Sequence, residues 1–202
     1  MPAARESLLD AAYTALARRA WSAVRMVDVA AVAGVSRQTL YNEFGSKEGL
    51  ARALVRRETD AYLAGVERAL GAHADARERL VATAEWTASA ARGNVLVRAM
   101  LTGCWSERLP ALTLSAVPSS SAVPAQRRAD GPLPSPADLV ALVRDKAVVS
   151  LATSRGVDTA ELARSCELVV RLSLSCVSAP PGEGGLSDLV RAALPPVRRL
   201  SV

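Results

Sequence analysis

A short polar segment near the N-terminus, residues 36–47, carries side chains that suit contact with DNA bases. Arg37 can pair with guanine O6 and N7, and Gln38 or Asn42 can pair with adenine N6 and N7. The methyl group of Thr39 can contact the methyl group of a thymine. An ordinary solvated helix surface has a similar composition, so these residue types alone leave both interpretations open.

The residues around this segment predict the elements that would position it. Apolar spacing predicts a short helix over 26–33, and Gly34 is a typical residue just beyond a helix end. Ser36 is placed to cap the next helix, 37–44. Two short helices joined by such a turn are typical of a helix-turn-helix. We expect a first helix over 5–20 in front of them.

The segment that follows also has clear boundaries. Trp21-Ser22-Ala23 separates the first two predicted helices. Gly45 and Ser46 end the third helix, and Ser46 can cap a fourth that runs over about 47–70. Lys47 then lies in the first turn of that helix, where its charge adds to the positive end of the helix dipole.

These predicted helix boundaries, together with the residues between them, make the N-terminal quarter of the chain resemble the TetR family of bacterial transcriptional regulators. The resemblance covers Arg5 to Val55 and rests on three strings at the family's spacing, Ala33-Gly34-Val35-Ser36, Leu40-Tyr41-Asn42-Glu43-Phe44 and Ser46-Lys47-Glu48-Gly49-Leu50. It implies an all-α protein. An N-terminal three-helix DNA-binding domain with a helix-turn-helix would span 1–48, and a larger helical effector-binding and dimerisation domain would span 49–202.

The resemblance also implies roles for single residues. Tyr41 and Lys47 match positions where the family contacts DNA phosphates, which orients a protein on DNA without reading sequence. Arg25 stands where the family often has a capping Thr or Ser, so we expect its side chain to make that phosphate contact. The expected DNA-binding residues are Arg25, Ser36, Arg37, Gln38, Thr39, Tyr41, Asn42 and Lys47.

The resemblance implies that the middle of the chain encloses a small-molecule effector that weakens DNA binding. Helical spacing continues over 76–91, 94–105 and 136–154, and the Ser- and Pro-rich stretch 115–136 is typical of a mobile loop. Large or soft side chains and a few polar ones are the predicted wall: Trp86, Asn94, Arg98, Met100, Cys104 and Trp105. Ordinary core packing is the alternative for each. Because few polar residues converge there, we expect an apolar or amphipathic effector.

The C-terminal part carries two apolar stripes that predict a dimer surface. Paired with the same stripes of a second copy, they would form a four-helix bundle; the alternative is packing within one chain. The predicted interface residues are Leu162, Cys166, Val169, Ser173, Val177, Leu186, Leu189, Val190 and Ala193. Cys166 and Cys176 lie about 15 Å apart along a helix and cannot bridge within it, which leaves buried free thiols or a disulfide between subunits.

Composition excludes several classes of protein. The 202 residues are half apolar and carry a net charge of +5, which permits an acidic partner such as DNA. Three cysteines without a CxxC spacing and one histidine, His73, make a zinc site or a Ser-His-Asp triad difficult to assemble. We therefore expect no metal, no cofactor and no enzyme activity; the rival hypothesis is an enzyme or carrier for an apolar ligand.

No uncharged apolar run is long enough for a membrane helix, and the N-terminus does not resemble a signal peptide. These features predict a cytoplasmic protein, and the resemblance to the TetR family implies that it is a homodimeric regulator, in the first place a repressor. It would bind a palindromic double-stranded DNA operator and be released by a small molecule.

Overall fold

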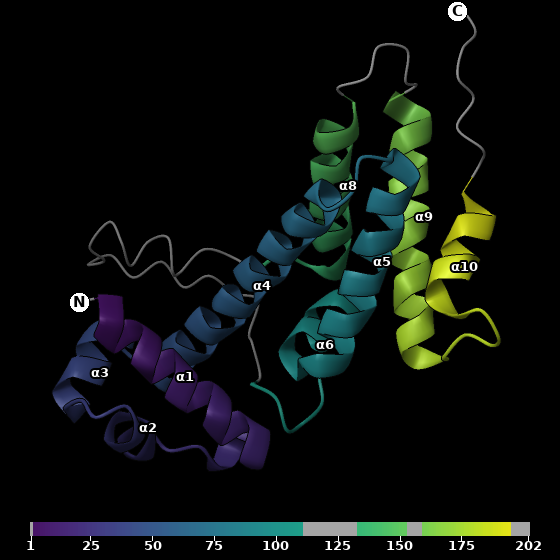
Figure 1. Ribbon diagram of the computed structural model, residues 1–202. Helices are drawn as coiled ribbons and strands as arrows, with labels where there is room; N and C mark the ends of the chain where they lie inside the picture. Colours follow the sequence, from purple (N-terminus) through teal and green to yellow (C-terminus); the bar gives the residue numbers. More distant parts are fainter. Residues whose placement is uncertain (1, 111–132, 153–158, 195–202) are drawn as a thin grey trace, which may run out of the picture. The chain divides into compact units, whose positions relative to one another are not determined.

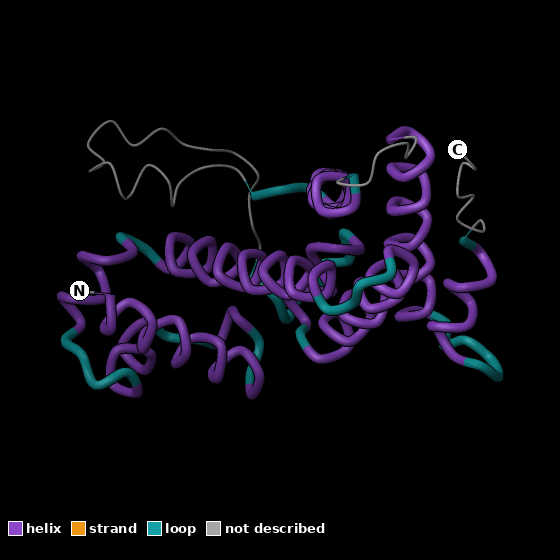
Figure 2. Tube along the Cα trace, turned by 45° about the horizontal axis from the view of Figure 1, so that its top comes forward, coloured by secondary structure: helices purple, strands orange, loops and turns teal. Residues whose placement is uncertain are grey.

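The computed structural model describes residues 2–110, 133–152 and 159–194 of the chain. Within these ranges the chain forms nine α-helices and one 3-10 turn and contains no β-strand (Figures 1 and 2). The predicted all-α class is confirmed. The helices are α1 (Pro2–Arg18), α2 (Met26–Val32), α3 (Arg37–Phe44), α4 (Lys47–Gly71), α5 (Ala76–Gly93), α6 (Val95–Thr102), α8 (Pro136–Leu151), α9 (Thr159–Ser178) and α10 (Gly185–Ala193), with the 3-10 turn at Trp21–Ala23.

The contacts within the chain divide it into two compact units. Unit 1 comprises residues 1–58 and 105–133, and unit 2 comprises residues 59–104 and 134–202. Helix α4 is continuous and supplies its first half to unit 1 and its second half to unit 2. The expected functional boundary after residue 48 is a different kind of division and stays a prediction.

Unit 1 is a small helical domain in which α1, α2 and α3 pack on one another. Its core is apolar, with Leu8 and Leu40 fully buried and Val29 only 1% exposed. Between α2 and α3, Gly34 has a φ of +68°, a left-handed conformation that side chains with a Cβ rarely adopt. This glycine therefore sets the sharp turn of the predicted helix-turn-helix, which the structure confirms.

A later segment of the chain returns to this domain. The backbone N–H of Trp21, in the 3-10 turn, donates to the carbonyl oxygen of Arg108 at 2.8 Å. Pro110, two residues after Arg108, is buried. The turn between α1 and α2 is thus held by residues that lie more than eighty positions away in the sequence.

Unit 2 is built around α5 and α9. Helix α5 packs on α9, α10 and α6, and α8 packs on α9 and α6. The α5 face contains Ala84, Thr87, Ala88 and Ala91, all fully buried. Small side chains of this kind let neighbouring helices approach closely, which accounts for the alanine-rich composition of this part of the chain.

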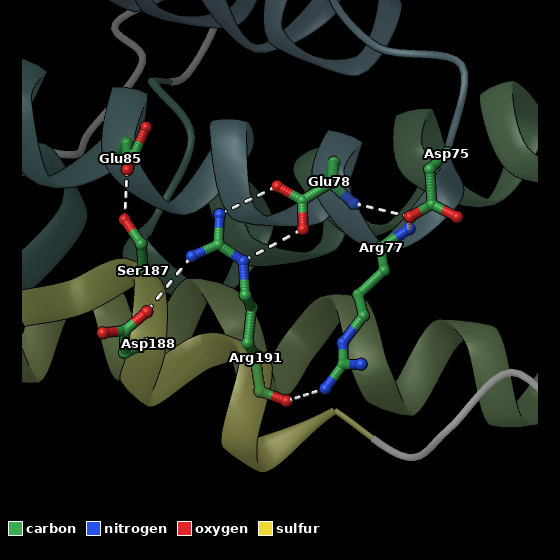
Figure 3. A network of polar contacts seen from close by, with 7 residues as sticks. All are labelled: Asp75, Arg77, Glu78, Glu85, Ser187, Asp188 and Arg191. Atoms are coloured by element: carbon green, nitrogen blue, oxygen red, sulfur yellow. Dashed lines mark hydrogen bonds and ion pairs between the residues drawn. The ribbon is translucent and has the colours of Figure 1, made fainter. Parts of the chain in front are cut away.

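Hydrogen bonds and ion pairs made by side chains connect α10 to α5 (Figure 3). The Arg191 guanidinium donates to both carboxylate oxygens of Glu78, at 3.0 and 2.9 Å, and to Asp188 at 3.2 Å. The Arg77 guanidinium donates to the carbonyl oxygen of Arg191, and the Ser187 hydroxyl donates to Glu85. The bonds from Arg191 lower the pKa of Glu78 below its ordinary value. Bidentate pairs of this kind are geometrically specific, so they fix the register of α10 on α5.

Most helix boundaries match the predicted ones within a few residues, but α6 ends earlier than expected. The helix was predicted to continue through Trp105 and instead stops at Thr102. Gly103 follows in the left-handed conformation, with a φ of +73°, and ends the helix as a C-terminal glycine. The predicted loop 115–136 falls largely on residues 111–132, which lie outside the described residues.

None of the described helices is both long enough and apolar enough to cross a membrane. The described residues also contain no group of three or more His, Cys, Asp or Glu side chains that could hold a metal ion.

Candidate nucleic-acid interface

The start of α3 is fixed by a side-chain cap. The Ser36 hydroxyl oxygen accepts a hydrogen bond from the backbone N–H of Thr39 at 3.0 Å and lies 2.8 Å from the Thr39 hydroxyl. The predicted capping role of Ser36 is confirmed. Leu40 and Phe44 are buried on the inner side of α3. The helix is therefore anchored at its first turn and along one face.

The outer side of α3 carries the polar residues predicted to read DNA. Arg37, Gln38, Tyr41 and Asn42 are exposed, and Thr39 is partly exposed. These side chains hold one another in position. The Gln38 amide nitrogen donates to the Asn42 carbonyl oxygen at 2.8 Å, and the Arg37 guanidinium lies 5.5 Å from the centre of the Tyr41 ring. The face is thus already organised, with the amide groups of Gln38 and Asn42 one helical turn apart and hydrogen-bonded to each other.

Lys47 is held against the turn between α1 and α2. Its ammonium group donates to the Ser22 carbonyl oxygen at 3.1 Å and lies 5.8 Å from the centre of the Trp21 ring. It is the first residue of α4, as expected. Ser46 precedes it and accepts from the Gly49 N–H at 3.1 Å, which confirms Ser46 as a cap.

Arg25 occupies the position before α2 and does not cap that helix with its side chain. Its guanidinium instead pairs with Asp28 in the first turn of α2, at 3.3 Å, and the Arg19 guanidinium pairs with the same carboxylate at 3.4 Å. The Arg25 side chain is 75% exposed. Sequence reasoning missed Asp28 and Arg19; the acidic residue three positions after Arg25 was the available signal.

The residues predicted to bind an effector lie in different surroundings. Met100 is buried and its sulfur accepts a hydrogen bond from Thr59. Trp86 is partly exposed, and its indole N–H donates to the Tyr62 carbonyl oxygen at 3.0 Å. Cys104 is exposed. Trp86 and Met100 therefore both contact residues of α4 within unit 2.

The polar members of that set bond to the backbone. The Asn94 side chain caps α6 by accepting from the N–H groups of Leu96 and Val97, and Arg98 donates to the Ala91 carbonyl oxygen at 3.1 Å. Trp105 is 39% exposed and belongs to unit 1, whereas the other five belong to unit 2. Their role in effector binding stays a prediction.

The structure does contain an open groove between the end of α4 and α8, with a volume of about 500 Å³. Lys146 and Glu67, which both line it, form an ion pair. None of the predicted effector residues lines it. Its apolar signal was visible in the sequence only as Leu142 and Val149 seven residues apart on one helix face, and both are exposed. The lining residues are Glu67, Leu70, Leu142, Asp145, Lys146, Val149 and Ser150.

The residues predicted for the dimer surface divide into two groups. The first group is buried within the single chain: Cys166, Val169, Ser173 and Val190. Burial raises the pKa of the Cys166 thiol to about 12. The second group keeps exposed or partly exposed surface: Leu162, Val177, Leu186, Leu189 and Ala193. All three cysteines are free thiols in the chain described.

Comparison with known proteins gives this arrangement a context. The family model described as bacterial regulatory proteins, tetR family, matches residues 8–54. The chain is 48% identical over 69 residues to the HTH-type transcriptional regulator AlkX of Mycobacterium tuberculosis, covering 34% of this chain and 33% of that protein. It is 40% identical over 81 residues to the HTH-type transcriptional activator FasR of Mycolicibacterium smegmatis, covering 40% and 37%.

The chain thus spans little more than a third of the length of these curated relatives. A solved structure extends the likeness to nearly the whole fold. It is that of a TetR-family transcriptional regulator from a Rhodococcus species, 25% identical with a TM-score of 0.55, covering 96% of this chain and 97% of that one. The matched sequence is the part that carries α1 to α3 and the beginning of α4.

Proposed function

We propose that this chain is a DNA-binding repressor of transcription, because residues 8–54 match the model of the bacterial regulatory proteins of the tetR family and the fold resembles that of a TetR-family regulator. In this proposal it binds a palindromic operator as a homodimer and leaves the operator when a small apolar or amphipathic molecule binds. The observation that carries the proposal is α3, a capped helix with a buried apolar side and an outer side of exposed Arg, Gln, Tyr and Asn residues.

Helix α3 enters the major groove of DNA in this proposal. Arg37 pairs with a guanine, and Gln38 or Asn42 pairs with an adenine. Tyr41 contacts a phosphate. The geometry supports these roles because the Gln38–Asn42 hydrogen bond already orders the two amides, and ordered side chains lose less entropy on binding.

Phosphate contacts on either side of α3 orient the helix in the groove. Arg25 and Lys47 supply two of them, and Ser36 supplies a third at the helix start. Support for Lys47 comes from its hydrogen bond to Ser22, which keeps the ammonium group near the turn that precedes α2. A charge held in place this way adds affinity without adding sequence preference.

A dimer follows from the geometry of DNA. Two recognition helices read successive major grooves when they lie about 34–36 Å apart. We propose that α9 and α10 form the contact between copies through their remaining exposed apolar surface, which includes Leu189 at 41% exposure and Leu168 at 40%. The buried members of the predicted interface would support this surface from behind.

The effector is proposed to bind in unit 2. An apolar or amphipathic molecule fits a region in which the groove between α4 and α8 presents Leu70, Leu142 and Val149 beside the Lys146–Glu67 ion pair. Binding weakens DNA affinity if the effector favours the state with the wrong spacing of the two α3 helices. This is a coupling between two sites, and DNA must then weaken effector binding by the same factor.

The direct test is a gel shift with the full-length protein and the DNA upstream of its own gene, followed by selection of sites from genomic fragments. A discrete complex that survives competitor DNA is the expected result. The double variant Arg37→Ala, Tyr41→Ala is expected to lose that complex and to keep its circular dichroism spectrum and its size in solution. Arg144→Ala, which removes one charge from α8 in unit 2, is the matched control and should bind as the wild type does.

Two outcomes would contradict the proposal. One is the absence of any competitor-resistant complex with either source of DNA. The other is unchanged operator affinity in the double variant, which would remove α3 from the role of recognition helix. A reporter gene downstream of the operator then decides the direction of regulation, because one relative is named as an activator.

A further inference from the structure

Two cationic side chains near the turn that joins α1 to α2 share one carboxylate. Asp28 accepts from the Arg19 guanidinium at 3.4 Å and from the Arg25 guanidinium at 3.3 and 3.5 Å. Lys47 reaches the same turn through the Ser22 carbonyl oxygen. Arg19, Arg25, Lys47 and Asp28 together carry a net charge of +2.

Both arginines keep most of their hydrogen-bonding capacity. The Arg19 and Arg25 side chains are 47% and 75% exposed, and the Asp28 side chain is 32% exposed. A guanidinium has five N–H donors in a planar fork. The bonds to Asp28 use one donor of Arg19 and two of Arg25 within the described chain.

Stability does not explain why two arginines share one carboxylate. An exposed ion pair contributes about 0–1 kcal/mol, and a second arginine on the same carboxylate adds repulsion between two cations. What the arrangement does provide is two planar guanidinium groups within reach of a common point. Guanidinium groups match the oxygens of a phosphate in both charge and shape.

We propose that Arg19 is a further ligand of the DNA backbone, held beside Arg25 by the shared carboxylate of Asp28. The two guanidinium groups bind one phosphate, or two adjacent phosphates, next to the groove that α3 enters. The inference rests on the proposed DNA-binding function. It differs from that function in giving a DNA backbone contact to the residue just after α1, ahead of all the predicted DNA-binding residues, of which Arg25 is the first.

The test measures operator affinity as a function of salt for Arg19→Ala and for Arg18→Ala. Arg18 is the neighbouring residue, the last of α1, also exposed and also basic, so both variants remove one positive charge from the same short stretch of chain. Each phosphate contact contributes about 0.9 to the slope of log affinity against log salt concentration. Arg19→Ala is expected to reduce that slope by about 0.9, whereas Arg18→Ala leaves it unchanged. Arg19→Lys keeps the charge and should keep most of the slope.

A second comparison separates direct contact from an indirect effect through Asp28. If Arg19 only neutralised the carboxylate, Asp28→Asn would restore the affinity that Arg19→Ala removes. With direct contact, the Arg19→Ala, Asp28→Asn double variant still has a slope smaller by about 0.9 than Asp28→Asn alone. Full restoration in the double variant overturns the proposal.

Failure of this inference and failure of the proposed function look different. Wild-type protein that forms no specific complex ends both. Wild-type protein that forms the complex, together with an Arg19→Ala slope equal to that of Arg18→Ala, ends only the role of Arg19.

Discussion

Ser36 allows helix capping and DNA contact to be separated at a single position. Its hydroxyl oxygen accepts from the Thr39 N–H at 3.0 Å, and Ser36→Ala removes that acceptor. Loss of an N-cap typically lowers the free energy of unfolding by about 1 kcal/mol. Ser36→Asp keeps an acceptor at the same place, and its negative charge is favourable at a helix N-terminus. We therefore expect Ser36→Ala to be destabilised and Ser36→Asp to be as stable as the wild type.

The order reverses for DNA binding. A carboxylate about 6 Å from a phosphate charge is repelled by about 0.7 kcal/mol in water and about 3 kcal/mol near a protein surface. Ser36→Asp should therefore weaken operator binding by roughly 3-fold to 100-fold. Ser36→Ala loses the uncharged hydroxyl contact to that phosphate, worth about 1 kcal/mol, and should weaken binding by about 5-fold; Leu40 and Phe44 still anchor α3 by burial.

Urea unfolding followed by tryptophan fluorescence gives the stabilities, and fluorescence anisotropy with labelled operator gives the affinities. Ser89→Asp on α5 is the matched control: Ser89 is exposed, and the change adds the same charge in unit 2. Operator binding by Ser36→Asp that equals that of the wild type would refute the placement of the α3 start beside the DNA backbone. Equal loss of stability in both Ser36 variants would refute the capping argument.

Three further outcomes follow from unit 2. A maleimide reagent should label only the exposed Cys104 in the native protein and all three cysteines in urea, as counted by mass spectrometry. Three labels on the native protein would contradict the burial of Cys166 and Cys176. Tyr62→Phe removes the bond to Thr87 and should cost about 1 kcal/mol of unfolding free energy in urea. Because Arg191 lowers the pKa of Glu78, the stabilisation that this pair provides is present near neutral pH and is lost as acid protonates Glu78. Arg191→Ala should raise the pKa of Glu78, which NMR of the carboxyl group measures.

The helix-turn-helix was predictable because its signals are local. Ser36 caps α3 through a residue three positions away, and Gly34 adopts its left-handed conformation within the turn itself. Such features depend on dihedral angles and hydrogen bonds among a few neighbouring residues, and the chain carries them wherever it folds. The bounds of α3, Arg37–Phe44, followed directly from them.

Other features depended on residues that meet only after folding. The sequence showed an apolar stripe on α9, but packing against α5 and α8 buries Cys166 and Val169 within a single chain. Periodicity reveals that a helix has an apolar side and not which partner covers it, because the covering side chains come from distant segments.

The ion pairs Arg19–Asp28 and Arg191–Glu78 also could not be predicted from the sequence. Arg19 and Asp28 are nine positions apart, and Arg191 and Glu78 are 113 apart, so spacing did not suggest either pair. The sequence alone determined the helix-turn-helix, the bounds of α3 and its cap, since these reside in short motifs. Only the tertiary structure decided which charges meet and where a groove opens, since Coulomb attraction and burial depend on distance in space rather than on distance along the chain.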